Sequence, residues 1–304
     1  MKWKLTGLGY AALMAALAFG AGGCASGDAG MNSRGPDVGR EPGERRESDG
    51  RGEPGERKRR EPGVVLRTWE RGIAVEAVDQ PGMAMYLWFY EWHMFDAVNP
   101  GQHTQGGYAQ FTKQVSEDGR RATLTSDTMK LTARAVADGA ELELTVRNAS
   151  EHDWPACAGI IPCFNPGPKE SANPQFTNTN TWFVSAGGLV KQQAREIHFN
   201  DALRAEVDAL SDAGTFVFSK KWPTSEVNAA EGLIVRESGD GTWVTGIAWE
   251  DFLSAQGHNP WQCMHLSVRV GPLKRGESRT TRGKIYLFRG DREACFKRYV
   301  AEFE

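Results

Sequence analysis

A strict alternation of apolar and polar side chains along residues 141–147 constrains the fold more than any other feature of the chain. Leu142, Leu144 and Val146 are apolar. The residues between them are charged or polar: Glu141, Glu143, Thr145 and Arg147. Successive side chains of a β-strand point to opposite faces, so this period of two places apolar groups on one face and charges on the other. The segment is therefore predicted to be a strand with one face in a core.

Similar strand signals run through residues 64–304. A meander is predicted over residues 108–115, 122–125, 129–136 and 141–146, followed by strands at 232–236, 242–249, 266–270 and 284–288. Helical spacing is confined to residues 201–210 and to a C-terminal segment, 291–303, with Asp291 as its N-cap. Many strands with little helix predict an all-β fold, a large antiparallel β-sandwich with few short helices.

The first 23 residues predict a secretory signal peptide. Lys2 and Lys4 form a basic head, an uncharged run rich in Leu, Ala and Gly follows, and small residues at 21–23 precede Cys24. This order is typical of a cleavable leader. An uncleaved membrane anchor is the alternative, although glycines interrupt the ~20 apolar residues that a spanning helix needs.

The same leader resembles the lipobox of bacterial lipoproteins, in which the cysteine is acylated and becomes the mature N-terminus. Ala21 stands where that family usually has Leu. The resemblance implies lipidation at Cys24, export, and a cell-envelope location in which the chain is anchored to a membrane. Plain secretion is the alternative.

Residues 24–63 predict the lipidated cysteine and a disordered tether. From residue 25 the segment has no aromatic residue, no Leu and no Ile, and the sequence Glu-Pro-Gly-Glu-Arg recurs at 41–45 and 53–57. Such a composition cannot bury enough apolar surface to fold. The remaining residues, 64–304, are predicted to form a single β-sandwich domain. This domain carries more acidic than basic residues, which argues against a nucleic-acid partner.

Four further cysteines lie in the predicted domain, and an even number in an exported protein favours disulfides. Four cysteines allow three connectivities. The preferred pairs are Cys157–Cys163, across a short loop, and Cys263–Cys295, which would join the final element to the preceding strand. Four reduced, buried thiols are the alternative.

Two segments resemble the galactose-mutarotase-like supersandwich proteins, which are associated with carbohydrates. One is the strand–turn–strand of residues 131–148, which ends in Asn148, and the other is the connector of residues 270–278 before a closing strand. The catalytic patterns of true aldose epimerases have no match. The resemblance therefore implies the architecture, and architecture alone does not transfer function.

A first candidate site lies on the aromatic segment 86–96. On a strand, Trp88 and Trp92 share one face, whereas Glu91 and His93 lie together on the other among apolar neighbours. Such a carboxyl–imidazole pair suits general acid–base chemistry, and a buried structural pair is the alternative. His103 follows in the next segment as a further candidate ligand-binding residue.

A second candidate site lies in residues 249–265, which are predicted to form a loop. Its candidate ligand-binding residues are Trp249, Asp251, Asn259, Trp261 and His265, with His258 as a candidate catalytic residue. Flat aromatic faces beside amides and carboxylates suit sugar rings. The sequence thus predicts a protein that binds carbohydrate or a cell-surface glycan. The alternatives are a sugar-acting enzyme that moves a proton through Glu91, His93 or His258, and a structural envelope protein.

A metal site assembled from the histidines is a weaker option. His93, His103, His258 and His265 could converge with Glu91 or Asp251 on zinc, but no His-x-His or His-x-x-x-His spacing is present. No phosphate-binding or dinucleotide-binding motif is present either. No metal and no cofactor are therefore predicted.

Overall fold

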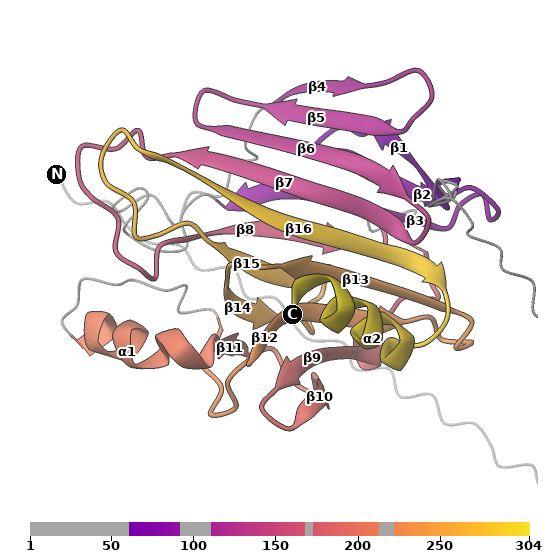
Figure 1. Ribbon diagram of the computed structural model, residues 1–304. Coiled ribbons are helices and arrows are strands. Elements are labelled where there is room, and N and C mark those ends of the chain that lie inside the picture. Colours follow the sequence, from indigo (N-terminus) through magenta and orange to yellow (C-terminus); the bar gives the residue numbers. More distant parts are fainter. Residues whose placement is uncertain (1–60, 92–110, 168–172, 213–221) are drawn as a thin grey trace, which may run out of the picture. The chain divides into compact units, whose positions relative to one another are not determined.

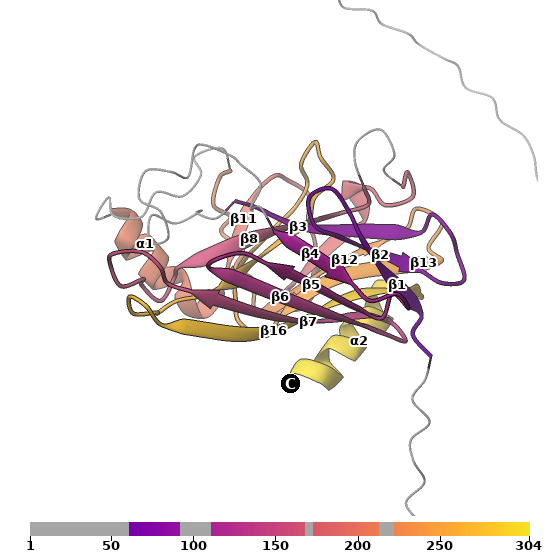
Figure 2. The ribbon, with the colours of Figure 1, turned by 90° about the horizontal axis from the view of Figure 1, so that it is seen from above.

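The computed structural model describes residues 61–91, 111–167, 173–212 and 222–304 (Figure 1). These residues form two antiparallel sheets that pack face to face, which confirms the predicted β-sandwich. Figure 2 shows the sheets as two layers, with the C-terminal helix α2 against the lower one. Within these ranges, no helix has both the length and the apolar character needed to cross a membrane.

One layer is a seven-stranded sheet in which every strand runs antiparallel to its neighbours. Its order is β1 (Val64–Thr68), β2 (Ile73–Ala77), β3 (Ala84–Glu91), β8 (Gly159–Asn165), β15 (His265–Arg269), β14 (Phe252–Gln256) and β11 (Ile197–Phe199).

The other layer is a nine-stranded antiparallel sheet. Its order is β10 (Gly188–Lys191), β9 (Thr181–Ser185), β12 (Glu231–Glu237), β13 (Trp243–Trp249), β16 (Ser278–Arg289), β7 (Gly139–Arg147), β6 (Met129–Val136), β5 (Arg121–Thr125) and β4 (Thr112–Val115).

The alternation at residues 141–147 has the predicted consequence in β7. Leu142, Leu144 and Val146 are buried, whereas the charged residues between them are exposed. The turn before β7 requires Gly139, which has a φ of 147° and passes so close to β16 that a Cβ atom would lie 1.9 Å from the Ile285 carbonyl oxygen.

The main core fills the space between the sheets. Leu87, Phe164 and Leu266 enter it from the seven-stranded sheet, and Leu144 and Ile285 enter it from the nine-stranded sheet. Since neighbouring positions on a strand point to opposite faces, Trp88, Cys163 and His265 belong to the other face of the seven-stranded sheet.

A second core cluster lies beneath α2 (Arg292–Phe303), where Cys295 and Tyr299 pack against Tyr286 of β16. Asp291 caps this helix as predicted, because its side chain accepts a hydrogen bond from the backbone N–H of Ala294 at 2.8 Å.

Several predicted bounds were wrong. The helix predicted at residues 201–210 is a short 3-10 turn, Asp201–Leu203, followed by α1 (Arg204–Asp212). The predicted loop 249–265 contains strand β14, whose five residues are all buried. Another 3-10 turn, Asn178–Asn180, precedes β9. Residues 159–165, which carried no strand prediction, form the fully buried β8 at the middle of the seven-stranded sheet.

Candidate thiol–imidazole site

The pairing of three strands brings two cysteines and a histidine together on the outer face of the seven-stranded sheet. Trp88 of β3 lies opposite Cys163 of β8. On the other side, Phe164 of β8 bridges to Met264, so that the register places His265 opposite Cys163. Cys263 is two residues before His265 and therefore projects to the same face.

The three side chains form a buried cluster, which we call the thiol–imidazole cluster: Cys163, Cys263 and His265. Their exposed fractions are 5%, 4% and 8%. The Cys163 Sγ lies 3.3 Å from the His265 Nε2, and one ligand atom from each residue lies within 4.8 Å of the others. Trp88 packs on the two cysteines, with Trp69 and Tyr86 partly buried beside it.

Hydrogen bonds favour the thiolate form of Cys263. The Cys163 thiol makes the strongest contribution, His265 adds a hydrogen bond and its charge, and the Asn165 Nδ2 donates to the Cys263 Sγ at 3.6 Å. Together they outweigh burial, which acts in the opposite direction, and hold the pKa of Cys263 well below its usual value. By contrast, burial raises the pKa of Cys157 to about 12. Of these two thiols, Cys263 is thus the one whose surroundings favour the thiolate.

A buried arginine lies behind Cys263. Arg236 of β12 is 0% exposed, and its guanidinium donates to the Thr181 Oγ1 at 2.7 Å, the Gln262 carbonyl oxygen at 2.7 Å and the Asn178 Oδ1 at 3.2 Å. Burial lowers the pKa of Arg236 to about 10, so the group still carries its charge at neutral pH. This positive charge acts on Cys263 and favours the thiolate there.

Cys263 lies at the end of a loop, residues 257–263, whose backbone is held by the amide side chain of Asn259. The Asn259 Oδ1 accepts from the backbone N–H groups of Trp261 and Cys263, and its Nδ2 donates to the Cys263 carbonyl oxygen at 2.7 Å. His258 and Gln262 have φ values of 57° and 58°, in the left-handed region that non-glycine residues seldom adopt. Strained backbone of this kind is concentrated at functional sites, so the loop is a candidate part of a functional site.

The same loop presents the most exposed large apolar side chain among the described residues. Trp261 is 59% exposed. The Arg195 guanidinium lies 5.5 Å from the Trp261 ring and 4.4 Å from the Trp222 ring. Trp222 in turn lies 5.8 Å from the His265 ring. The exposed indole is therefore connected through Arg195 and Trp222 to the buried cluster.

The structure thus brings together four of the predicted ligand-binding residues. Trp88 and His265 belong to or contact the thiol–imidazole cluster, whereas Asn259 and Trp261 form the adjoining loop. His258, the predicted catalytic residue, is in the same loop and is partly exposed. The side-chain hydrogen bonds of Asn259 all go to the loop backbone.

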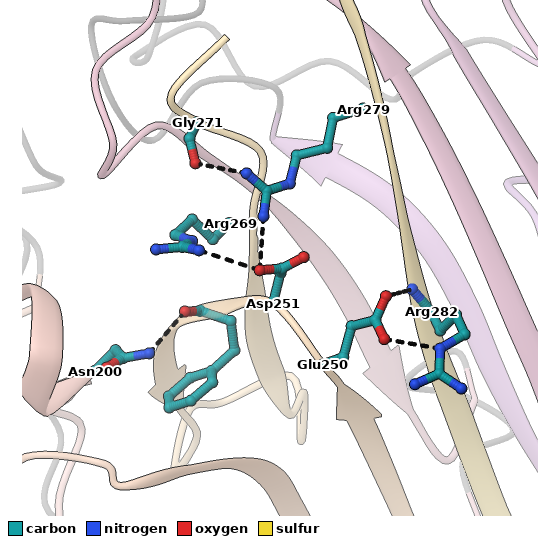
Figure 3. Close-up of polar contacts among 8 residues, drawn as sticks. Asn200, Glu250, Asp251, Arg269, Gly271, Arg279 and Arg282 are labelled. Atoms are coloured by element: carbon teal, nitrogen blue, oxygen red, sulfur yellow. Dashed lines mark hydrogen bonds and ion pairs between the residues drawn. The ribbon is translucent and has the colours of Figure 1, made fainter. Parts of the chain in front are cut away.

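Two other predicted ligand-binding residues lie apart from this cluster and have partners within the fold. Trp249 of β13 is 0% exposed and belongs to the core between the sheets. Asp251 accepts hydrogen bonds from Arg279 at 2.7 Å and Arg269 at 3.1 Å, as Figure 3 shows, and so joins the two sheets.

The remaining candidates of the aromatic segment are not placed. Glu91 ends β3, where its backbone lies opposite Ile161 of β8. Trp92, His93 and His103 lie outside the described residues, as does Cys24.

The two predicted disulfides are wrong: none of the four cysteines of the domain, all within the described ranges, is in a disulfide. Cys157 lies in the core between the sheets and Cys295 lies beneath α2. Cys163 and Cys263 instead lie together on the outer face. Both pairings failed because strand register, and not the order of elements along the chain, determines which thiols meet.

Sequence reasoning missed the thiol–imidazole cluster itself. His265 was singled out, but its neighbours Cys163 and Cys263 were assigned to two different disulfides. The Cys263-x-His265 spacing was the available signal, because on an extended backbone it places a thiol and an imidazole on one face.

Comparisons with known proteins found only remote structural likenesses. No protein-family model and no curated protein matches the chain. A similar solved structure is a galactose mutarotase-like protein from Lactobacillus casei ATCC 334, with 10% identity, a TM-score of 0.38, and coverage of 74% of this chain and 100% of that chain. Another is a proposed aldose 1-epimerase from Escherichia coli K12, with 12% identity, a TM-score of 0.32, and coverage of 74% and 78%. At these values, neither likeness indicates what this chain binds.

Proposed function

We propose that the chain is an exported, lipid-anchored protein that binds carbohydrate through the loop of residues 257–263 and its surroundings. The observation that carries this proposal is Trp261, an indole that is 59% exposed on a loop held by Asn259 and Arg236. A flat ring that is held out on a fixed loop offers a stacking surface to a partner with an apolar face.

The neighbours of Trp261 suit a sugar. A sugar ring stacks its C–H groups on an aromatic face and needs hydrogen-bond partners for its hydroxyl groups. Arg195 lies beside the indole, and the partly exposed His258 and Gln262 flank it in the loop. Because the loop is already fixed in place, little conformational entropy would be lost on binding.

The test is a glycan array of printed oligosaccharides, followed by titration of the best glycan against variants. Trp261→Ala removes an exposed side chain and should leave the fold intact while weakening binding at least about fivefold, which corresponds to ~1 kcal/mol. Trp261→Phe keeps a flat ring and should lose less. The matched control is Val78→Ala, which trims another apolar side chain that is 56% exposed. An array without any binding, or equal affinity for Trp261→Ala and the unaltered chain, contradicts the proposal.

The anchoring part of the proposal rests on the leader and on Cys24. Globomycin, which blocks lipoprotein signal cleavage, should cause unprocessed precursor to accumulate, and Cys24→Ala should release the protein from the membrane fraction. Normal processing under globomycin contradicts lipidation and leaves plain secretion, whereas a leader that stays uncleaved with and without globomycin indicates an uncleaved anchor.

A further inference from the structure

We propose that Cys163, Cys263 and His265 bind a d10 metal ion, with Zn²⁺ as the occupant, on the outer face of the seven-stranded sheet. Two thiols and an imidazole whose ligand atoms all lie within 4.8 Å of one another are the donor set that this class of ion prefers. The proposal does not rest on carbohydrate binding, because its ligands are the three buried side chains and not the exposed indole.

The distances fit a tetrahedral ion with a small adjustment of the side chains. Zn–S bonds of ~2.3 Å and Zn–N bonds of ~2.0 Å put a sulfur and a nitrogen ~3.5 Å apart, and two sulfurs ~3.8 Å apart. The Cys163 Sγ and the His265 Nε2 already lie 3.3 Å apart. Rotation of the side chains can bring the three ligand atoms to these distances. Cys163 and His265 occupy facing positions of paired strands, and Cys263 belongs to the same cluster.

The charges of the surroundings also fit. Two thiolates balance the charge of a divalent ion, which makes the occupied site compatible with burial. Asn165 donates to the Cys263 Sγ at 3.6 Å, and Arg236 holds the carbonyl oxygen of the preceding Gln262 at 2.7 Å. These contacts orient Cys263 and favour its thiolate in the way that outer-shell groups support metal ligands.

The other two cysteines of the domain offer no such environment and serve as controls. Cys157 lies among apolar side chains in the core between the sheets, and Cys295 lies beneath α2, both 0% exposed. In the described part of the chain, the thiol–imidazole cluster is the only convergence of three side chains of the metal-binding types. Three protein ligands leave one tetrahedral position for water or another ligand.

The experiment measures metal in the full chain purified under reducing, zinc-replete conditions. We expect one zinc ion per chain by elemental analysis. Replacement with Co²⁺ should produce near-ultraviolet sulfur-to-cobalt charge-transfer absorption. Cys263→Ala and His265→Gln should weaken zinc binding at least about a hundredfold in competition with a chromophoric chelator, because even outer-shell groups contribute about 10- to 100-fold. Cys157→Ala and Cys295→Ala should bind as the unaltered chain does.

Three results would overturn the proposal. One is a folded, reduced chain without stoichiometric zinc and without the cobalt charge-transfer absorption. Another is zinc affinity that is unchanged in both cluster variants or equally reduced in the two control variants. The third is a Cys163–Cys263 disulfide that persists in protein isolated from zinc-replete cells, detected by mass spectrometry of a non-reduced digest. Circular dichroism checks that each variant is folded. If a variant does not fold, the cobalt spectrum of the unaltered chain still tests the proposal.

Discussion

Replacing Asp251 by alanine separates its structural role from the ligand-binding role that the sequence suggested. Its Oδ1 accepts hydrogen bonds from Arg279 at 2.7 Å and from Arg269 at 3.1 Å, and the three side chains are only 22–28% exposed (Figure 3). A hydrogen bond to a charged group contributes about 1.5–3 kcal/mol. Allowing for partial solvent screening of both ion pairs, we expect Asp251→Ala to lower the free energy of unfolding by about 2–3 kcal/mol.

The measurement is urea unfolding followed by tryptophan fluorescence, with the neighbouring Glu250→Ala as the control. Glu250 pairs with Arg282 at 2.7 Å, but the Arg282 side chain is 66% exposed. Loss of this ion pair in Glu250→Ala should therefore lower the free energy of unfolding by about 1 kcal/mol or less. For a domain of this size, 2–3 kcal/mol corresponds to a decrease in Tm of about 4–12 °C. Affinity for a glycan found on the array should not change.

The pH dependence gives a second check on Asp251. Burial alone would raise its pKa, but hydrogen bonds and charges from Arg279 and Arg269 outweigh burial and lower the pKa below its usual value. A carboxyl group with a lowered folded-state pKa stabilises the fold above its unfolded-state pKa, and this stabilisation is lost as the pH falls through the folded-state value. The difference between Asp251→Ala and the unaltered chain should therefore shrink below about pH 4. A loss under 1 kcal/mol at neutral pH, or lost glycan binding with unchanged stability, would refute this reasoning.

Two further substitutions test the packing around β16. Lys284 is 5% exposed, and its ammonium group lies 2.9 Å from the Asp138 carboxylate. We expect Lys284→Met to lower the free energy of unfolding in urea by about 3–5 kcal/mol, against almost no change for Lys130→Met at an exposed position. Gly283→Ala would place a Cβ atom 2.4 Å from the Trp249 ring, and we expect a loss of at least about 1–3 kcal/mol with a changed near-ultraviolet circular dichroism spectrum. Unchanged stability in either variant would contradict the packing described.

The sandwich could be predicted from the sequence because its clearest strands have one face in water. In β7 the exposed Glu141 and Glu143 alternate with buried leucines, and this produces a period of two. Strands β8 and β14 are buried on both faces, so their sequences carry no alternation and remained unassigned or were read as loop.

The site was only partly predictable for the same reason. Trp88, Trp261 and His265 were singled out from the sequence because aromatic and imidazole groups are distinctive residue types. Cys163 was assigned wrongly, because it lies on β8, a strand that was not predicted, and its partner is 100 positions away in the chain. Which residues face each other across paired strands depends on register, and register follows from the packing of the whole sheet.

The pairing of β8 with β15 links the chemistry of one face to the hydrophobic packing of the other. A slip of one residue between these strands would turn either Phe164 or Leu266 out of the core, and the same slip would carry Cys163 away from His265. Any chain that folds well enough to fill its interior has therefore also assembled these two donor groups. Mutations of the surrounding surface can alter which molecules reach Cys163 and His265. The two donors themselves stay together as long as the strand register that fills the core is kept.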